Sequence, residues 1–115
     1  MTQANQESQA NQILKQLNQA IQEQNWKQAE ALFDPDFFKQ TPKKYWEHQI
    51  KLAIQEKGKI QSFNSVSYQK DPRFGGDFYI YVISIAHEHG ISHETVTIIK
   101  PISDKPMMIS GFLFK

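Results

Sequence analysis

The segment from Phe78 to Lys100 constrains the fold more than any other part of the chain, because it contains two strand-like runs joined by a short turn. The runs, Phe78–Ala86 and Ile91–Ile99, are dominated by β-branched and aromatic residues, which favour strands. Gly90 lies in the turn between them, where glycine tolerates the positive φ of a tight hairpin. The segment therefore predicts a β-hairpin at the centre of an antiparallel sheet.

The spacing of apolar residues is helical in the chain before Gly58 and strand-like in the segments on both sides of the hairpin. Apolar residues at helical spacing predict helices over residues 10–33, with a break near Asn25, and over residues 42–57. The pattern changes at Gly58, after which strands are predicted near residues 60–68, 77–87, 91–100 and 107–115. The order of helices first and a four-stranded antiparallel meander second predicts an α+β fold, with the helices packed on one face of the sheet.

The length of 115 residues suits a single domain. Residues 1–10 contain no apolar anchor, so we expect a disordered tail there and one α+β domain over residues 11–115. The polar opening lacks the basic and then apolar pattern of a signal peptide. It is compatible with a natural start and with a tether left after removal of an export signal.

Composition excludes several functions. The chain has no cysteine, which excludes disulfides, thiol catalysis and thiolate metal sites. Arg73 is the only arginine among thirteen basic residues and the net charge is +1, which disfavours nucleic acid as a partner. No run approaches the ~18 apolar residues of a membrane-spanning helix, so no membrane span is expected.

Alternation divides the predicted sheet into two faces. A two-residue turn at His89-Gly90 pairs Ile85 with Glu94, and pairing Lys100 with Met107 adds the last strand. The first face is mostly aliphatic and is assigned to the core: Tyr79, Tyr81, Ile83, Ile85, His87, Glu94, Val96, Ile98, Ile109, Gly111 and Leu113. The second face mixes apolar and hydroxyl residues: Phe78, Ile80, Val82, Ser84, Ala86, His93, Thr95, Thr97, Ile99, Met108, Ser110, Phe112 and Phe114.

The first face supplies the candidate catalytic residues. In one interpretation Tyr79 and Tyr81 donate hydrogen bonds in a pocket, while His87 and Glu94 form an acid/base pair. In the alternative, His87 and Glu94 lie at the open edge of the hairpin and contact water, and the tyrosines expose their hydroxyls. Because no phosphate loop or nucleophile elbow is present, the sequence favours a non-catalytic domain and leaves the enzyme question open.

Three histidines near the turn suggest a metal site, but their positions argue against it. Zinc requires three or four converging ligands, whereas alternation sends His87 and His93 to opposite faces and leaves His89 in the turn. We therefore expect no metal and no cofactor.

The second face predicts an interface. If helices cover only the first face, the second leaves an apolar surface of several hundred Å² in water, which is large for a monomer. A homodimer is the simplest way to bury it, although sheet curvature and the N-terminal segment are an alternative cover. The residues assigned to this interface are Phe78, Ile80, Val82, Ile99, Met108, Phe112 and Phe114.

Two stretches of the chain resemble a known superfamily. Asn25-Trp26-Lys27, followed by Ala31-Leu32-Phe33-Asp34-Pro35-Asp36-Phe37, looks like the helix-to-strand elbow of the nuclear transport factor 2-like (cystatin-like) superfamily. His93-Glu94-Thr95-Val96-Thr97-Ile98 and Met108-Ile109-Ser110-Gly111-Phe112 look like the last strands of an uncharacterised bacterial group of small, often exported domains. That group usually carries Asp-Gly-x-Trp before the last strand, where this chain has Lys105-Pro106-Met107.

The resemblance implies a cone-shaped fold in which helices pack into a curved sheet, and a periplasmic or secreted location, with a cytoplasmic one still open. It brings no established activity. We expect a non-catalytic binding or protein-interaction domain of a bacterial cell envelope, with a homodimer or another protein as partner. The alternatives are a small isomerase, dehydratase or hydrolase with an apolar pocket in the cone, and an inhibitor that neutralises a toxin.

Overall fold

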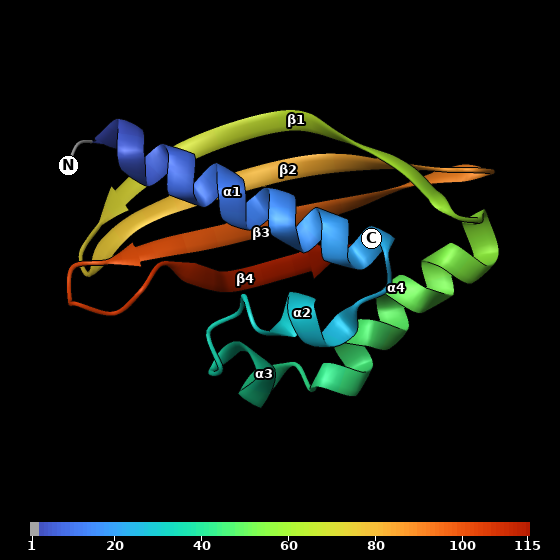
Figure 1. Ribbon diagram of the computed structural model, residues 1–115, viewed down its shortest axis with the longest axis horizontal. Coiled ribbons are helices and arrows are strands. Elements are labelled where there is room, and N and C mark those ends of the chain that lie inside the picture. Colours follow the sequence, from blue (N-terminus) through green and yellow to red (C-terminus); the bar gives the residue numbers. More distant parts are fainter. Residues whose placement is uncertain (1–2) are drawn as a thin grey trace.

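The computed structural model describes residues 3–115 and confirms the α+β class: N-terminal helices followed by an open, four-stranded antiparallel sheet. The strands follow the order β1-β2-β3-β4; α1 lies across one face of the sheet, and α2 and α3 lie beside β4 (Figure 1). In chain order the elements are α1 (Gln3–Gln22), α2 (Trp26–Glu30), α3 (Phe37–Gln40), α4 (Lys43–Lys57), β1 (Ile60–Arg73), β2 (Gly76–His87), β3 (Gly90–Pro101) and β4 (Met108–Phe114). Within residues 3–115, no helix is long and apolar enough to span a bilayer.

Helix α1 crosses the sheet and begins at Gln3, where the sequence predicted a disordered tail to residue 10 (Figure 1). Two features hold this early part to the sheet. Ala10 is fully buried, and the Tyr79 hydroxyl on β2 donates a hydrogen bond to Gln6 Oε1 at 3.0 Å. These two contacts come from a small residue and a side-chain amide, whereas the helix prediction depends on large apolar residues. Residues 1 and 2 of the predicted tail lie outside the described residues.

The predicted helix break near Asn25 is confirmed. Gln24 adopts a positive φ of 56°, and the Asn25 side chain accepts a hydrogen bond from the Gln28 amide at the start of α2. Between the two predicted helical stretches, 10–33 and 42–57, the structure adds the short helix α3, which contains Phe37 and Phe38.

An aromatic cluster joins the helices to β4. The Phe33 ring lies 5.2 Å from that of Trp46, and Trp46 lies 5.8 Å from Phe112. Phe33 also forms a parallel bridge to Ile109, supported by a 2.8 Å hydrogen bond from the Asp34 amide to the Ile109 carbonyl. This bridge covers part of the outer edge of β4.

The end of the central hairpin packs on the end of α4. Gly58 follows α4 with a φ of 91°, and a Cβ there would lie 2.8 Å from the Cβ of Glu88. The Glu88 carboxylate accepts a hydrogen bond from the Lys59 amide, and the His89 amide donates to the Lys57 carbonyl. These contacts fix the residues that form the turn.

Because of these contacts the turn is Glu88-His89, and the predicted turn at His89-Gly90 is wrong. His87 pairs with Gly90, and Glu94 pairs with Ile83 rather than with Ile85. Gly90 has no positive φ; glycine suits this position because a Cβ would lie 3.1 Å from Lys57. The register moves by two residues, so every side chain of the hairpin stays on its predicted face.

Strand β4 contains a bulge that the sequence pattern does not indicate. Thr97 pairs with Gly111 but Ile98 pairs with Ile109, which leaves Ser110 as the extra residue. Beyond the bulge the faces are exchanged: Phe112 is buried and Leu113 is 66% exposed. The predicted faces of Gly111, Leu113, Phe112 and Phe114 are therefore wrong. The aromatic cluster explains the exchange, because it places the Phe112 ring beside Trp46.

Candidate functional site

All four candidate catalytic residues lie on the face of the sheet that the helices cover. Tyr79, Tyr81 and His87 come from β2, and Glu94 comes from β3; all four are buried. Their assignment to the core face is confirmed.

The tyrosine hydroxyls are bonded to α1. Tyr79 donates to Gln6 at 3.0 Å and Tyr81 to Asn11 at 2.7 Å. Burial is the largest cause that raises the pKa of both phenols, so both remain neutral donors. The interpretation with water-exposed hydroxyls is therefore wrong.

Glu94 is the most unusual residue of the site. Its side chain is fully buried, and neither carboxyl oxygen has a hydrogen-bond partner of good geometry. Burial raises the pKa of Glu94 to about 8, and the nearby Asn18 amide lowers it in part. The carboxyl group is therefore mostly protonated at pH 7. The interpretation that placed Glu94 in water is wrong.

His87 does not form the predicted pair with Glu94. Its Nδ1 lies 2.9 Å from the Gly58 carbonyl, so this nitrogen donates, and its Nε2 lies 2.7 Å from the Ser92 hydroxyl. The Nδ1 bond thus joins the hairpin to the end of α4, and the Nε2 bond joins β2 to β3 within the hairpin. His87 is buried as well, which rules out the alternative that it contacts water at the edge of the hairpin.

The three histidines near the turn do not converge. His87 points toward the helices, while His89 is exposed in the turn and His93 is exposed on the other face. Among the residues from 3 to 115, no three His, Asp or Glu side chains are arranged to hold a metal ion.

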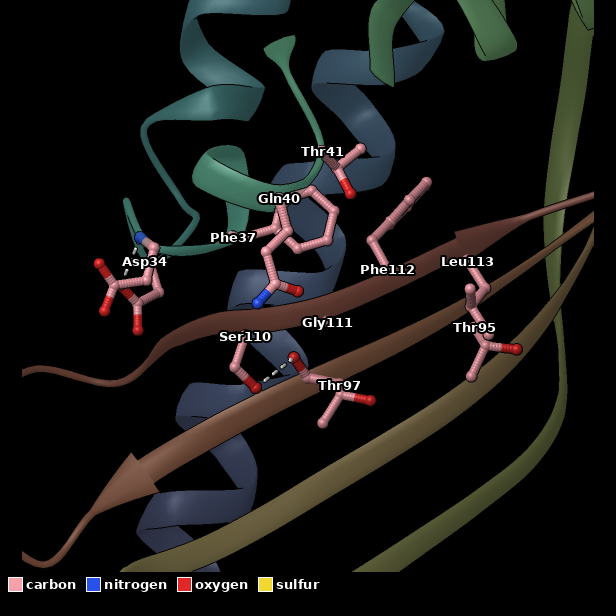
Figure 2. A pocket seen from close by; sticks show the side chains of 11 residues that line it. Asp34, Phe37, Gln40, Thr41, Thr95, Thr97, Ser110, Gly111, Phe112 and Leu113 are labelled. Carbon is pink, nitrogen blue, oxygen red and sulfur yellow. Dashed lines mark hydrogen bonds between the residues drawn. The ribbon is translucent and has the colours of Figure 1, made fainter. Parts of the chain in front are cut away.

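A surface hollow of about 530 Å³ lies between α3 and the β3–β4 part of the sheet (Figure 2). Its carboxylates are used locally, since Asp34 accepts the Asp36 amide hydrogen at 3.0 Å and Asp36 pairs with Lys39 at 2.9 Å. None of the four candidate catalytic residues lines this hollow, whose lining is Asp34, Asp36, Phe37, Gln40, Thr41, Thr95, Thr97, Ser110, Gly111, Phe112 and Leu113.

The outer face of the sheet, opposite α1, carries most of the predicted interface residues. Five of them are partly exposed there: Phe78, Ile80, Val82, Ile99 and Met108. Phe112 and Phe114 do not belong to this face, since both pack against the core under the helices. Ile91 and Leu113, at 58% and 66% exposure, take their place.

Asn18 belongs to the site although it is not among the residues predicted from the sequence. It lies on α1, is about nine-tenths buried and neighbours Glu94, and its Oδ1 has no partner. The sequence does contain a signal for it, because Leu14 and Ile21 lie four residues before and three residues after it, on the same helix face.

Comparison of the chain with protein-family models, with curated proteins and with solved structures found no match.

Proposed function

We propose that this chain is a non-catalytic interaction domain that self-associates through the outer face of its sheet. The observation that carries the proposal is the uneven packing: α1 lies across the inner face, and no helix lies over β2 on the other side (Figure 1). We define the outer-face patch by its partly or largely exposed apolar residues, which are Phe78, Ile80, Val82, Ile91, Ile99, Met108 and Leu113.

The chemistry of the patch suits a second copy of the chain. Serine and threonine side chains separate its apolar residues, and neighbouring β1 contributes the uncharged Ser62, Asn64, Ser67 and Gln69. At the Phe78 end, Asp71 is neutralised by an ion pair with Arg73. A two-fold arrangement places equal surfaces against each other without repulsion between like charges. Burying several hundred Å² at ~25 cal/mol per Å² offers several kcal/mol before the cost of association.

The test is the oligomeric state of the wild type and of two matched variants. We expect a dimer for the wild type, a folded monomer for Val82→Asp, and a dimer for Val66→Asp. Val66 is an exposed residue at a bulge of β1 outside the patch, so it receives the same charge without touching the interface. Multi-angle light scattering near 100 μM, with circular dichroism as a folding control, gives the answer.

A monomeric wild type would exclude self-association. If the Val66→Asp dimer dissociates as much as the Val82→Asp dimer, the added charge weakens the dimer at either position, and the outer-face patch is not the interface. If Val82→Asp monomerises and also loses a protein captured by the wild type, the same face serves a foreign partner, such as a toxin.

The proposal includes the relationship suggested by the sequence. Helices on one face of a four-stranded antiparallel sheet support a nuclear transport factor 2-like cone. The bacterial envelope location depends on the resemblance of the last two strands.

One observation favours a second candidate, a small enzyme. A buried carboxyl group with a strongly raised pKa is typical of acid/base catalysts. If an activity exists and Glu94 carries its proton, Glu94→Gln lowers kcat by at least about a hundredfold while the folded structure is kept. Unchanged turnover in this variant would remove Glu94 from any catalytic role.

A further inference from the structure

A second hollow, of about 430 Å³, lies between α1 and the edge strand β1. Its lining contains one lysine, no acidic residue, and otherwise amide, hydroxyl and apolar side chains: Asn11, Leu14, Lys15, Asn18, Gln19, Gln22, Ser62, Phe63, Ser65 and Ile83. We call it the α1–β1 groove. Its volume falls in the range of small-molecule sites.

Three donors line one stripe of α1 along this groove. Asn11, Lys15 and Asn18 are separated by four and three residues, so they lie on one face of the helix. The Asn11 oxygen already accepts the Tyr81 hydroxyl at 2.7 Å, which leaves the Asn11 amide hydrogens for another acceptor. Lys15 makes no ion pair within residues 3–115 that would neutralise its charge.

Asn18 connects the groove to the buried Glu94. The Asn18 oxygen is shielded from solvent and has no partner, and neither oxygen of Glu94 has a partner of good geometry. The Asn18 amide faces Glu94, because its hydrogen bond lowers the pKa of that carboxyl group in part. An amide nitrogen carries two hydrogens, so the second hydrogen of Asn18 is left for another acceptor.

We propose that the α1–β1 groove binds a small organic carboxylate with an apolar body. The carboxylate accepts hydrogen bonds from Asn11 and Asn18 and pairs with Lys15. The apolar body lies on Leu14, Phe63 and Ile83. A cationic ligand is disfavoured, because the groove offers an ammonium group and no carboxylate.

Octanoate is the probe, with octanol and octylammonium as matched probes of the same chain length. Calorimetry should show saturable binding of octanoate that is at least about ten times tighter than binding of octanol, and no binding of octylammonium. In ¹H–¹⁵N spectra the largest shifts should fall on the Asn11 and Asn18 side-chain amides. Equal affinity for octanoate and octanol, or shifts confined to the outer-face patch, would overturn the proposal.

Two variants test the groove directly. Lys15→Gln should remove the preference for octanoate over octanol, whereas Lys44→Gln, on the exposed surface of α4, should keep it. Ser65→Trp should fill the groove and abolish binding while circular dichroism stays native. A Lys15→Gln variant with wild-type preference would refute the ionic contact, whether or not Ser65→Trp folds.

The groove and the outer-face patch are independent. Val82→Asp, as a monomer, should bind octanoate as the wild type does, so failure of one proposal leaves the other intact.

Discussion

At the scale of single residues, Glu94 combines features that a stable core normally avoids. A carboxyl group without partners costs free energy on burial, and much more when it is charged. The chain reduces this cost by keeping the group protonated. The buried hydroxyls of Tyr79 and Tyr81 do not carry this cost, because α1 provides a hydrogen-bond acceptor for each.

The raised pKa of Glu94 makes stability depend on pH. The folded pKa of about 8 lies above the ordinary 4.5, so the folded state binds this proton more tightly than the unfolded state. The resulting stability is fully present below pH 4.5 and is lost as the pH rises through 8, by about 1.4 kcal/mol per pH unit between these values.

Urea unfolding of wild type and Glu94→Gln at pH 5.5, 6.5 and 7.5 checks this prediction. The free energy of unfolding of the wild type should fall with pH relative to that of the glutamine variant. Parallel pH profiles would mean that Glu94 has an ordinary pKa in the folded protein.

Residue patterns predicted the Glu94 face correctly but not its surroundings. Side chains alternate between the two faces along a strand, so Glu94 and its neighbour His93 lie on different faces. An error of two residues in the register of the hairpin leaves both residues on the same faces. The depth of burial depends on α1 and Asn18, which are more than seventy residues away in the chain. A local pattern contains no information on such a contact.

At the scale of elements, the hairpin β2–β3 and helix α4 were predictable because each has a strong period and clear end signals. Helix α1 was predicted too short because its first turns are anchored by Gln6 and Ala10 rather than by large apolar residues. Strand β4 was assigned the wrong faces after Ser110, because a bulge changes the period without a distinctive residue.

The bulge in β4 predicts unequal costs for two neighbouring substitutions. Phe112→Ala should destabilise the protein by about 3 kcal/mol, since it removes a ring packed on Phe33 and Trp46. Leu113→Ala should change the free energy of unfolding by less than about 0.5 kcal/mol, since that side chain is mostly exposed.

Chemical denaturation of both variants at low protein concentration keeps the monomer as the reference. The opposite order of costs would place Leu113 in the core and would argue for a β4 without the bulge.

At the scale of the whole molecule, the shortest dimension is 19 Å, which accommodates one sheet and one helical layer. The sequence predicted this two-layer arrangement from the change of period at Gly58. It did not predict the α1–β1 groove, which depends on the angle at which α1 crosses the sheet.

The contact between Gly58 and Glu88 also limits how the chain can change over generations. Any side chain at position 58 would collide with the Cβ of Glu88, in a backbone conformation that only glycine adopts easily. Position 88 is tied in turn to the Lys59 amide. Lineages descended from this protein should therefore keep glycine at position 58 and preserve the meeting point of α4 and the hairpin.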